Sequence, residues 1–243
     1  MRALRRTLRA LVVLICLLAL AFALYAFIRN RPQDLPWTPL DLGQPVGLFT
    51  GRKLTALTED YPRCRLRLDR AGASYAEAPE VDGGDHCGYS DGVRLRARGS
   101  NTIRFAPADL TTSCSVAAAF LMWEWNTIQP AAQRIFGQRV ETVQHFGSYS
   151  CRRMYGRDSG PWSEHATADA LDVAGFELAD GTRISVAGDW NGSGDKARFL
   201  HAVRDGACDL YATVLSPDYN AAHRDHLHLD QANRGAAGWR ACR

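Results

Sequence analysis

The stretch 163-SEHATADALDVAGF-176 decides how the centre of this chain must fold. It holds a histidine, His165, and seven residues later an aspartate, Asp172. On a helix these two residues would lie on one face but about 10 Å apart along the axis. Ligands of one zinc ion must converge to about 2 Å from one point, so a shared metal requires a loop leading into a strand. Strand alternation then places Asp172 between small residues on one face, and Leu171 and Val173 on the other.

A second stretch, 223-HRDHLHLD-230, carries three of the seven histidines in the chain. In a strand, His226, His228 and Asp230 share one face, and Leu227 and Leu229 face the opposite way, toward a core. Such a pattern predicts a strand that presents imidazole and carboxylate groups to one side.

The two stretches together predict a metal centre. A single histidine is usually a structural residue, and an aspartate near a strand start is usually a turn or cap residue. Two short segments that combine His165, Asp172 and His228, with further carboxylates beside them, are harder to explain in that way. Two histidines and one aspartate with a fourth position open form a hydrolytic zinc set, so the expected cofactor is Zn²⁺.

The rest of the chain predicts an α+β fold, with a small antiparallel sheet flanked by helices. Residues 113–136 have the apolar spacing and the N-cap of a helix, which Pro130 is expected to kink. Asp180 and Gly181 form a turn between two apolar segments, which predicts a hairpin. Residues 48–112 suggest short strands and turns. Further elements are expected at 139–146 (strand), 197–203 (helix), 210–215 (strand) and 225–229 (strand).

The N-terminal segment differs in character from the rest. Residues 10–28 carry no charge, four arginines precede them and two follow. This length and the positive-inside rule predict a cytoplasmic basic segment (1–9), a transmembrane signal anchor (10–28), a linker with four prolines (29–47) and an exported domain (48–243). The exported domain would lie in the periplasm or otherwise outside the cytoplasm of a single-pass protein. A cleaved signal peptide is the alternative.

Charge and cysteine content agree with export. Of the 29 basic residues, six arginines fall within residues 1–31, which leaves 23 basic against 26 acidic residues and no footprint for nucleic acid. Cys16 lies in the anchor, and the six other cysteines allow up to three disulfides in an oxidising compartment. Fifteen pairings are possible, of which we expect the one between neighbours: Cys64–Cys87, Cys114–Cys151 and Cys208–Cys242. No CxxC pair suggests a zinc–thiolate site.

Ser163-x-His165-x6-Asp172 followed by His226-x-His228 resembles the motif pair of the D-alanyl-D-alanine metallopeptidases, the superfamily of lysostaphin-type endopeptidases and the hedgehog domain. The phrases at 146–152, 163–176 and 213–230 resemble the bacterial extensin-like C-terminal family over roughly Cys64 to Arg243. This resemblance implies a hedgehog/D,D-peptidase-like zinc peptidase fold. It also implies that His165, Asp172 and His228 bind zinc.

The resemblance assigns further roles. Arg152 matches an arginine that holds a substrate carboxylate, although a surface arginine beside a disulfide is as good an interpretation. Ser163 matches a serine that shapes the site, or it is a turn or cap residue. The catalytic base is either Asp225 or His226, and strand alternation favours His226. His223 and Asp230 are candidates for fixing a ligand tautomer, and Glu164 is expected to point away.

The expected function is that of an exported, membrane-anchored zinc metallopeptidase, a D,D-carboxypeptidase or an endopeptidase. Its substrates would be peptidoglycan stem peptides or cross-links that contain D-amino acids, and it would contact the membrane through its N-terminal helix. The main rival function is that of a non-catalytic cell-wall binding or scaffold module that keeps the zinc, since the hedgehog domain of the same superfamily serves signalling. A metal-dependent phosphoesterase and a metal-free structural protein of the cell wall are two more rivals.

Overall fold

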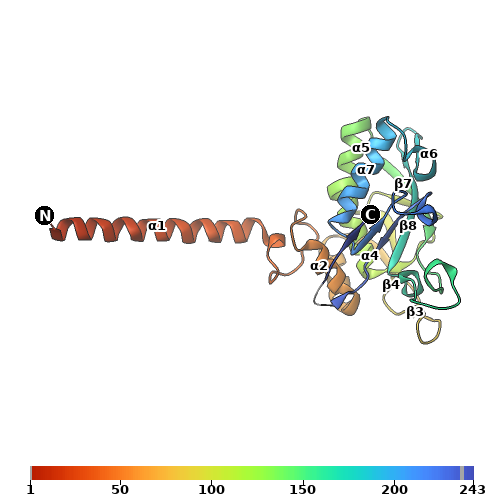
Figure 1. Ribbon diagram of the computed structural model, residues 1–243, viewed down its shortest axis with the longest axis horizontal. Coiled ribbons are helices and arrows are strands. Elements are labelled where there is room, and N and C mark those ends of the chain that lie inside the picture. Colours follow the sequence, from red (N-terminus) through yellow and green to blue (C-terminus); the bar gives the residue numbers. More distant parts are fainter. Residues whose placement is uncertain (1, 236–237) are drawn as a thin grey trace.

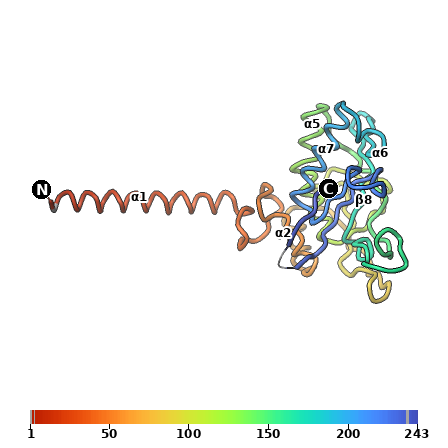
Figure 2. The backbone as a smooth tube through the Cα atoms, viewed as in Figure 1, coloured from red at the N-terminus to blue at the C-terminus, as the bar shows by residue number. Residues whose placement is uncertain are grey.

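The first element is a long apolar helix, α1 (Arg2–Asn30), which projects away from the rest of the molecule (Figure 1). The computed structural model describes residues 2–235 and 238–243. Within Leu4–Asn30 an 18-residue window has a mean hydropathy of 3.0, and at 1.5 Å per residue the span is about 40 Å long, enough to cross a bilayer. A signal sequence has the same features. The N-terminus lies at the free end of α1 and the C-terminus lies within the folded domain (Figure 2).

The folded part mixes helices and strands, as the sequence predicts. Its helices are α2 (Thr50–Thr55), α3 (Tyr61–Arg70), α4 (Cys114–Trp123), α5 (Gln129–Phe136), α6 (Val186–Asp189) and α7 (Asp195–Cys208). Its strands are β1 (Ala73–Glu77), β2 (Val81–Asp82), β3 (Gly88–Tyr89), β4 (Gly92–Gly99), β5 (Arg104–Ala106), β6 (Thr112–Ser113), β7 (Val140–Gly147), β8 (Ala170–Leu178), β9 (Arg183–Ser185), β10 (Thr213–Leu215), β11 (Leu227–Asp230) and β12 (Ala241–Cys242).

The main sheet is larger than predicted and only partly antiparallel. It has seven strands in the order β12-β10-β11-β8-β7-β5, with β9 paired to β8. The pairs around β8 and β11 are antiparallel, whereas the outer pairs β10/β12 and β5/β7 are parallel. The two parallel edges join segments far apart in the sequence, which local alternation does not reveal. A second sheet, β1-β4-β6, and the short pair β2-β3 lie outside it.

The two faces of the main sheet have different roles. Leu171 and Val173 of β8 and Leu227 and Leu229 of β11 are fully buried in the apolar core. Helix α4, all of whose residues are buried, belongs to the same core, and α5 and α7 run side by side next to it (Figure 1). The opposite face of β8 and β11 carries Asp172 and His228, as alternation predicts. The packed face therefore fixes the polar face that forms the site.

The predicted helix at 113–136 is confirmed, with its interruption. The Ser113 hydroxyl accepts a hydrogen bond from the Val116 amide at 3.4 Å and caps α4. A π-helical turn, Glu124–Ile128, separates α4 from α5, and Pro130 lies in the first turn of α5. Proline tolerates that position because the amides of a first turn have no partner within their own helix. The hairpin at Asp180 and Gly181 is also confirmed, as β8 pairs with β9.

Two expectations about the first part of the domain were wrong or incomplete. Residues 48–112 contain the predicted short strands, but also helices α2 and α3. The segment at 29–47 is not simply extended, because Pro32–Asp34 forms a 3₁₀ turn and Leu40 and Leu42 are buried in the domain core. The chain that follows α1 is therefore packed against the domain and holds it close to the end of that helix.

The predicted disulfide pairing is right for one pair and wrong for two. Cys208–Cys242 is present as expected, but the other pairs are Cys64–Cys114 and Cys87–Cys151. Helices α3 and α4 pack together, which brings Cys64 of α3 to Cys114 at the start of α4. Cys87 lies between β2 and β3, and its partner Cys151 lies in the loop after β7. Pairing therefore follows tertiary packing and not closeness in sequence. Cys16 of α1 is free.

The Cys64–Cys114 bond is expected to contribute strongly to stability. Both residues are fully buried, and the bond closes a loop across 50 residues of chain. The chain-entropy relation gives a loss of about 4 kcal/mol for the Cys64→Ala/Cys114→Ala variant. Chemical unfolding monitored by circular dichroism checks this value. Peptide mapping under non-reducing conditions checks the pairing, and recovery of a Cys64–Cys87 peptide would contradict it.

Candidate metal centre

His165 is held by a tight turn that precedes β8. The 3₁₀ turn Glu164–Thr167 carries it, and the Ser163 hydroxyl caps this turn by accepting a hydrogen bond from the His165 amide at 3.3 Å. The His165 carbonyl accepts from the Ser150 amide at 2.8 Å. The loop-into-strand path predicted from the seven-residue gap is therefore present. Of the two roles considered for Ser163, the structure shows that of a cap.

Asp172 and His228 are direct neighbours across two strands. Asp172 of β8 is paired in register with His228 of β11. Side chains of such pairs have Cβ atoms about 5 Å apart on the same face of the sheet, so the strand pairing alone brings the carboxylate and the imidazole into contact. This register follows from burying Leu171, Val173, Leu227 and Leu229 on the other face.

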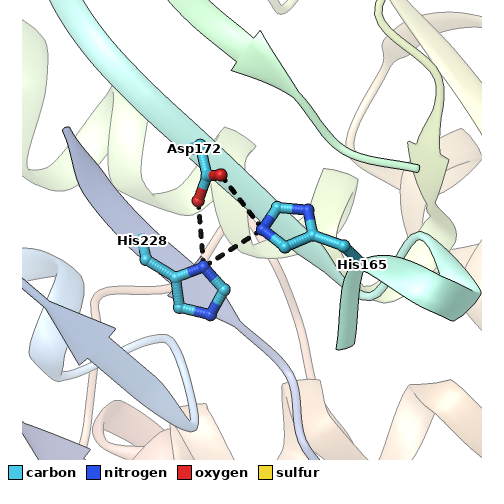
Figure 3. A group of neighbouring side chains, drawn as sticks. All are labelled: His165, Asp172 and His228. Atoms are coloured by element: carbon cyan, nitrogen blue, oxygen red, sulfur yellow. Dashed lines mark hydrogen bonds and ion pairs between the residues drawn. The ribbon is translucent and has the colours of Figure 1, made fainter. Parts of the chain in front are cut away.

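The three predicted ligands converge on one point (Figure 3). His165 Nε2 lies 3.1 Å from Asp172 Oδ2, and His228 Nδ1 lies 2.9 Å from Asp172 Oδ1. The two ring nitrogens are 3.2 Å apart. One ligand atom from each residue lies within 4.8 Å of the others, and all three residues are buried or nearly so. Ligands of a tetrahedral zinc about 2 Å from the ion have this spacing.

In His165 and His228, the ring nitrogen that points away from the cluster already has a hydrogen-bond acceptor. His165 Nδ1 donates to the Ser148 carbonyl at 2.5 Å, and His228 Nε2 donates to Asp230 Oδ2 at 3.1 Å. Each acceptor holds a proton on the nitrogen that it contacts, and His165 Nε2 and His228 Nδ1 are the atoms that face the cluster. Asp230 thus contacts His228 in the position that its predicted role of fixing a tautomer requires. His223 does not, because its Nδ1 contacts Asn220 Oδ1 at 2.8 Å instead of a ligand.

The electrostatics of the cluster favour a bound cation. Burial alone raises the pKa of the Asp172 carboxyl, but hydrogen bonds and charge from His165 and His228 outweigh burial and lower that pKa well below its usual range. Burial lowers the pKa of His228, and its hydrogen bonds to Asp172 and Asp230 reverse this and raise it to about 9. Without a metal, a proton on His228 therefore holds the two side chains together. A metal ion would replace that proton.

His226 stands beside the three ligands. It immediately precedes β11, and its Nε2 lies 3.6 Å from Asp172 Oδ1. Its Nδ1 lies 2.9 Å from Asp225 Oδ1, and this hydrogen bond lowers the pKa of the Asp225 carboxyl. Because the carboxylate can only accept, Nδ1 carries a proton, and Nε2 is the ring nitrogen that faces the cluster. The structure thus places His226 at the cluster and Asp225 behind it.

A cleft of about 810 Å³ opens above the cluster. Arg152, Ser163, His223 and His226 line it together with the three predicted ligands. The Arg152 guanidinium has no hydrogen bond or ion pair among the residues that the structure describes. Glu164 was expected to point away, but it lines the cleft as well. Burial, followed by the charges of Asp230 and Asp169, raises the pKa of its carboxyl to about 7.

Sequence reasoning missed several contributors. The Ser148 contact to His165 uses a backbone carbonyl, which no residue type reveals. Asn220 holds His223 in place, and burial and neighbouring charges give His223 a pKa lowered to about 4. An asparagine three residues before a histidine at a turn was a usable signal, since such side chains bind nearby backbone and ring groups.

Comparison with known proteins shows the family and nothing beyond it. Neither the curated proteins nor the solved structures include a significant match to this chain. A family model does match, and its match covers both histidine-bearing stretches and all six paired cysteines. Residues 62–243 fit that model along most of the chain, and the protein is therefore a member of the family described as the extensin-like protein C-terminus.

Proposed function

We propose that this protein is an exported, membrane-anchored zinc metallopeptidase that cleaves D-amino-acid-containing peptides of the cell wall. The observation that carries the proposal is the convergence of His165 Nε2, Asp172 and His228 Nδ1 at the floor of a cleft. Three protein ligands with one side open to a cleft are typical of hydrolytic zinc sites, whereas structural zinc sites have four. The resemblance to D,D-metallopeptidases and the hedgehog domain suggests the same fold type.

The residues present fit zinc. Two imidazoles and one carboxylate are ligands that zinc prefers, and each imidazole is oriented from behind by Ser148 or Asp230. Bound at this point, zinc would polarise a carbonyl group and make a water molecule acidic enough to attack it near neutral pH. The remaining chemistry falls to the residues around the cluster.

His226 is the proposed proton-transfer residue. Its Nε2 faces the cluster, 3.6 Å from Asp172 Oδ1, and Asp225 holds the ring by Nδ1. A histidine oriented by a carboxylate accepts a proton on one nitrogen without losing its orientation. Asp225 is therefore a positioning residue.

Arg152 is the proposed contact for a substrate carboxylate. A guanidinium with no partner among the described residues, in a cleft that also contains the ligand cluster, suits a terminal carboxylate, which it can bind through two hydrogen bonds.

The proposed location of the domain outside the cytoplasm is supported by α1 and by the three disulfides, which form in oxidising compartments.

Arg152→Ala is expected to weaken binding of peptides with a free C-terminal carboxylate by about tenfold to a hundredfold, the value of one or two charged hydrogen bonds. The measurement is KM for a carboxylate-ended peptide and for its amide. The amide is expected to bind wild type and variant equally. The control is Arg224→Ala, since Arg224 is exposed and bonds the carbonyl of Ala221. A variant that loses affinity equally for both peptides would contradict this role.

The test of the function itself is incubation of the full chain in detergent with defined muropeptides, with and without a chelator, followed by mass spectrometry. The expected result is loss of a D-amino acid or of a cross-link that stops with the chelator and returns with added zinc. Stoichiometric zinc with every muropeptide left intact would instead indicate a binding or scaffold module.

A further inference from the structure

A second cavity adjoins the cleft of the candidate metal centre. It has a volume of about 320 Å³ and lies between α2 with its following turn and the C-terminal segment. The two cavities share Arg234, Trp239 and Arg240, so they meet along this segment. A ligand longer than the first cleft would therefore continue into the second.

Trp239 stands at the junction with 60 % of its surface exposed, which is unusual for the largest apolar side chain. Its neighbours hold it there. The Arg240 guanidinium donates to the Tyr211 carbonyl at 2.6 and 3.1 Å, and Cys242 is bonded to Cys208. The Ala241 amide donates to the Ala212 carbonyl at 2.9 Å. The backbone on the C-terminal side of Trp239 is thus fixed, and the exposure of the ring is part of the fold.

One face of the Trp239 ring is already covered. The Arg234 guanidinium lies 4.3 Å from the ring centre and is itself held by the Thr213 hydroxyl at 2.6 Å. A cation over one face orients the indole and leaves the other face open. The open face is a flat apolar surface of the kind on which a second flat or ring-shaped group stacks.

The second cavity has a mixed lining, and its polar side chains are already paired. Asn233 Nδ2 donates to Glu59 Oε1 at 2.6 Å, and the Thr55 hydroxyl donates to Gln231 Oε1 at 2.7 Å. Arg234 and Arg240 are bonded to backbone carbonyls, and Arg52 also has a partner. Among the described residues, the apolar side chains that line this cavity are Trp239 and three alanines, and a free anion would find no uncommitted cation. A ring with an apolar face and a rim of hydroxyl and amide groups matches both the indole and the walls.

We propose that Trp239, Arg234 and Asn233 form a saccharide subsite, in which a pyranose ring stacks on the open face of Trp239. The choice of glycan rests on the proposed function, because cell-wall peptides are attached to β-1,4-linked N-acetylhexosamines. The protein would then bind peptide that is still attached to its glycan strand, with the sugar in the second cavity and the peptide over the metal ligands.

The test is calorimetric titration of the full chain in detergent with the β-1,4-linked tetramer of N-acetylglucosamine. Wild type is expected to bind saturably, and equally well with a chelator present. Trp239→Ala is expected to lower affinity at least about tenfold, the value of one stacking contact. Trp239→Phe, which keeps a ring, should lose less. The matched control is Trp37→Ala, since Trp37 is a still more exposed tryptophan, at 72 %, outside both cavities.

Failure of the subsite and failure of the enzyme give different results. Tetramer binding without muropeptide cleavage would support the subsite and overturn the proposed peptidase activity. Cleavage without tetramer binding would support the peptidase activity and overturn the subsite. Unchanged affinity in Trp239→Ala would overturn the subsite, provided that the melting temperature and the zinc content match wild type. If that variant does not fold, Trp239→Phe and Asn233→Ala provide the same comparison, and wild-type affinity in both would overturn the subsite.

Discussion

Asp172→Ala is expected to remove stoichiometric zinc from the protein. The carboxylate is the ligand that touches both histidines, at 3.1 Å from His165 Nε2 and 2.9 Å from His228 Nδ1. Loss of a residue behind a ligand costs up to about a hundredfold in metal affinity, so loss of a ligand should cost at least that. The measurement is zinc per chain by atomic absorption after dialysis, with a competitive chelator titration for the affinity.

The matched control for this prediction is Asp180→Ala. Asp180 is an aspartate in the exposed turn between β8 and β9, at the far end of the strand that carries Asp172. It is expected to keep one zinc per chain. Melting temperatures compared in excess chelator separate loss of metal from loss of fold. Stoichiometric zinc in a folded Asp172→Ala/His228→Ala variant would show that the ion, if present, binds elsewhere.

The geometry behind this prediction was largely available from the sequence. Two constraints fixed it: a metal shared across the seven-residue gap excludes a helix, and the alternation of leucine with histidine in 226–229 gives β11 its two faces. Both are local, and both agree with burial of an apolar face. The register of β8 against β11, which places Asp172 opposite His228, then follows with little freedom.

Other features depend on contacts that no short stretch encodes. Helix α3 contains Cys-Arg-Leu-Arg-Leu at 64–68, an alternation typical of a strand. Only Cys64 and Leu68 are buried, four residues apart, and the cap from Asp60 to the Arg63 amide marks the helix start. This alternation favours a strand, but the segment forms a helix, because α4 packs against one narrow stripe of α3.

The disulfides show the same limit. Neighbour pairing minimises loop length, but the order of the cysteines in sequence says nothing about which helices pack together. Cys64 meets Cys114 because α3 lies against α4. Likewise, the group that orients His165 is the backbone carbonyl of Ser148, and Asn220 holds His223 from a turn before β11. Positions of this kind become visible only when the chain is folded.

His226→Ala is expected to keep one zinc per chain and to lower kcat for muropeptide cleavage by about a hundredfold to ten-thousandfold, the usual contribution of a general acid–base residue. Zinc should stay because the ring lies 3.6 Å from Asp172 Oδ1 and is not one of the three converging ligands. Asp225→Ala should lose less, since it removes the group that orients the ring and leaves the ring itself. His201→Ala, on helix α7 across the sheet, is the histidine control.

This comparison separates the two interpretations of the cleft. If Asp225 transferred the proton, Asp225→Ala would be the more damaging change and His226→Ala the milder one. If the protein were a binding module, neither change would alter retention on the cell wall, and zinc would remain in both. A selective loss of kcat in His226→Ala, with zinc content and KM near wild type, requires an imidazole that acts only during turnover. Among the residues that line the described cleft, His226 meets that requirement by position, because its Nε2 faces the three candidate ligands and Asp225 holds its Nδ1.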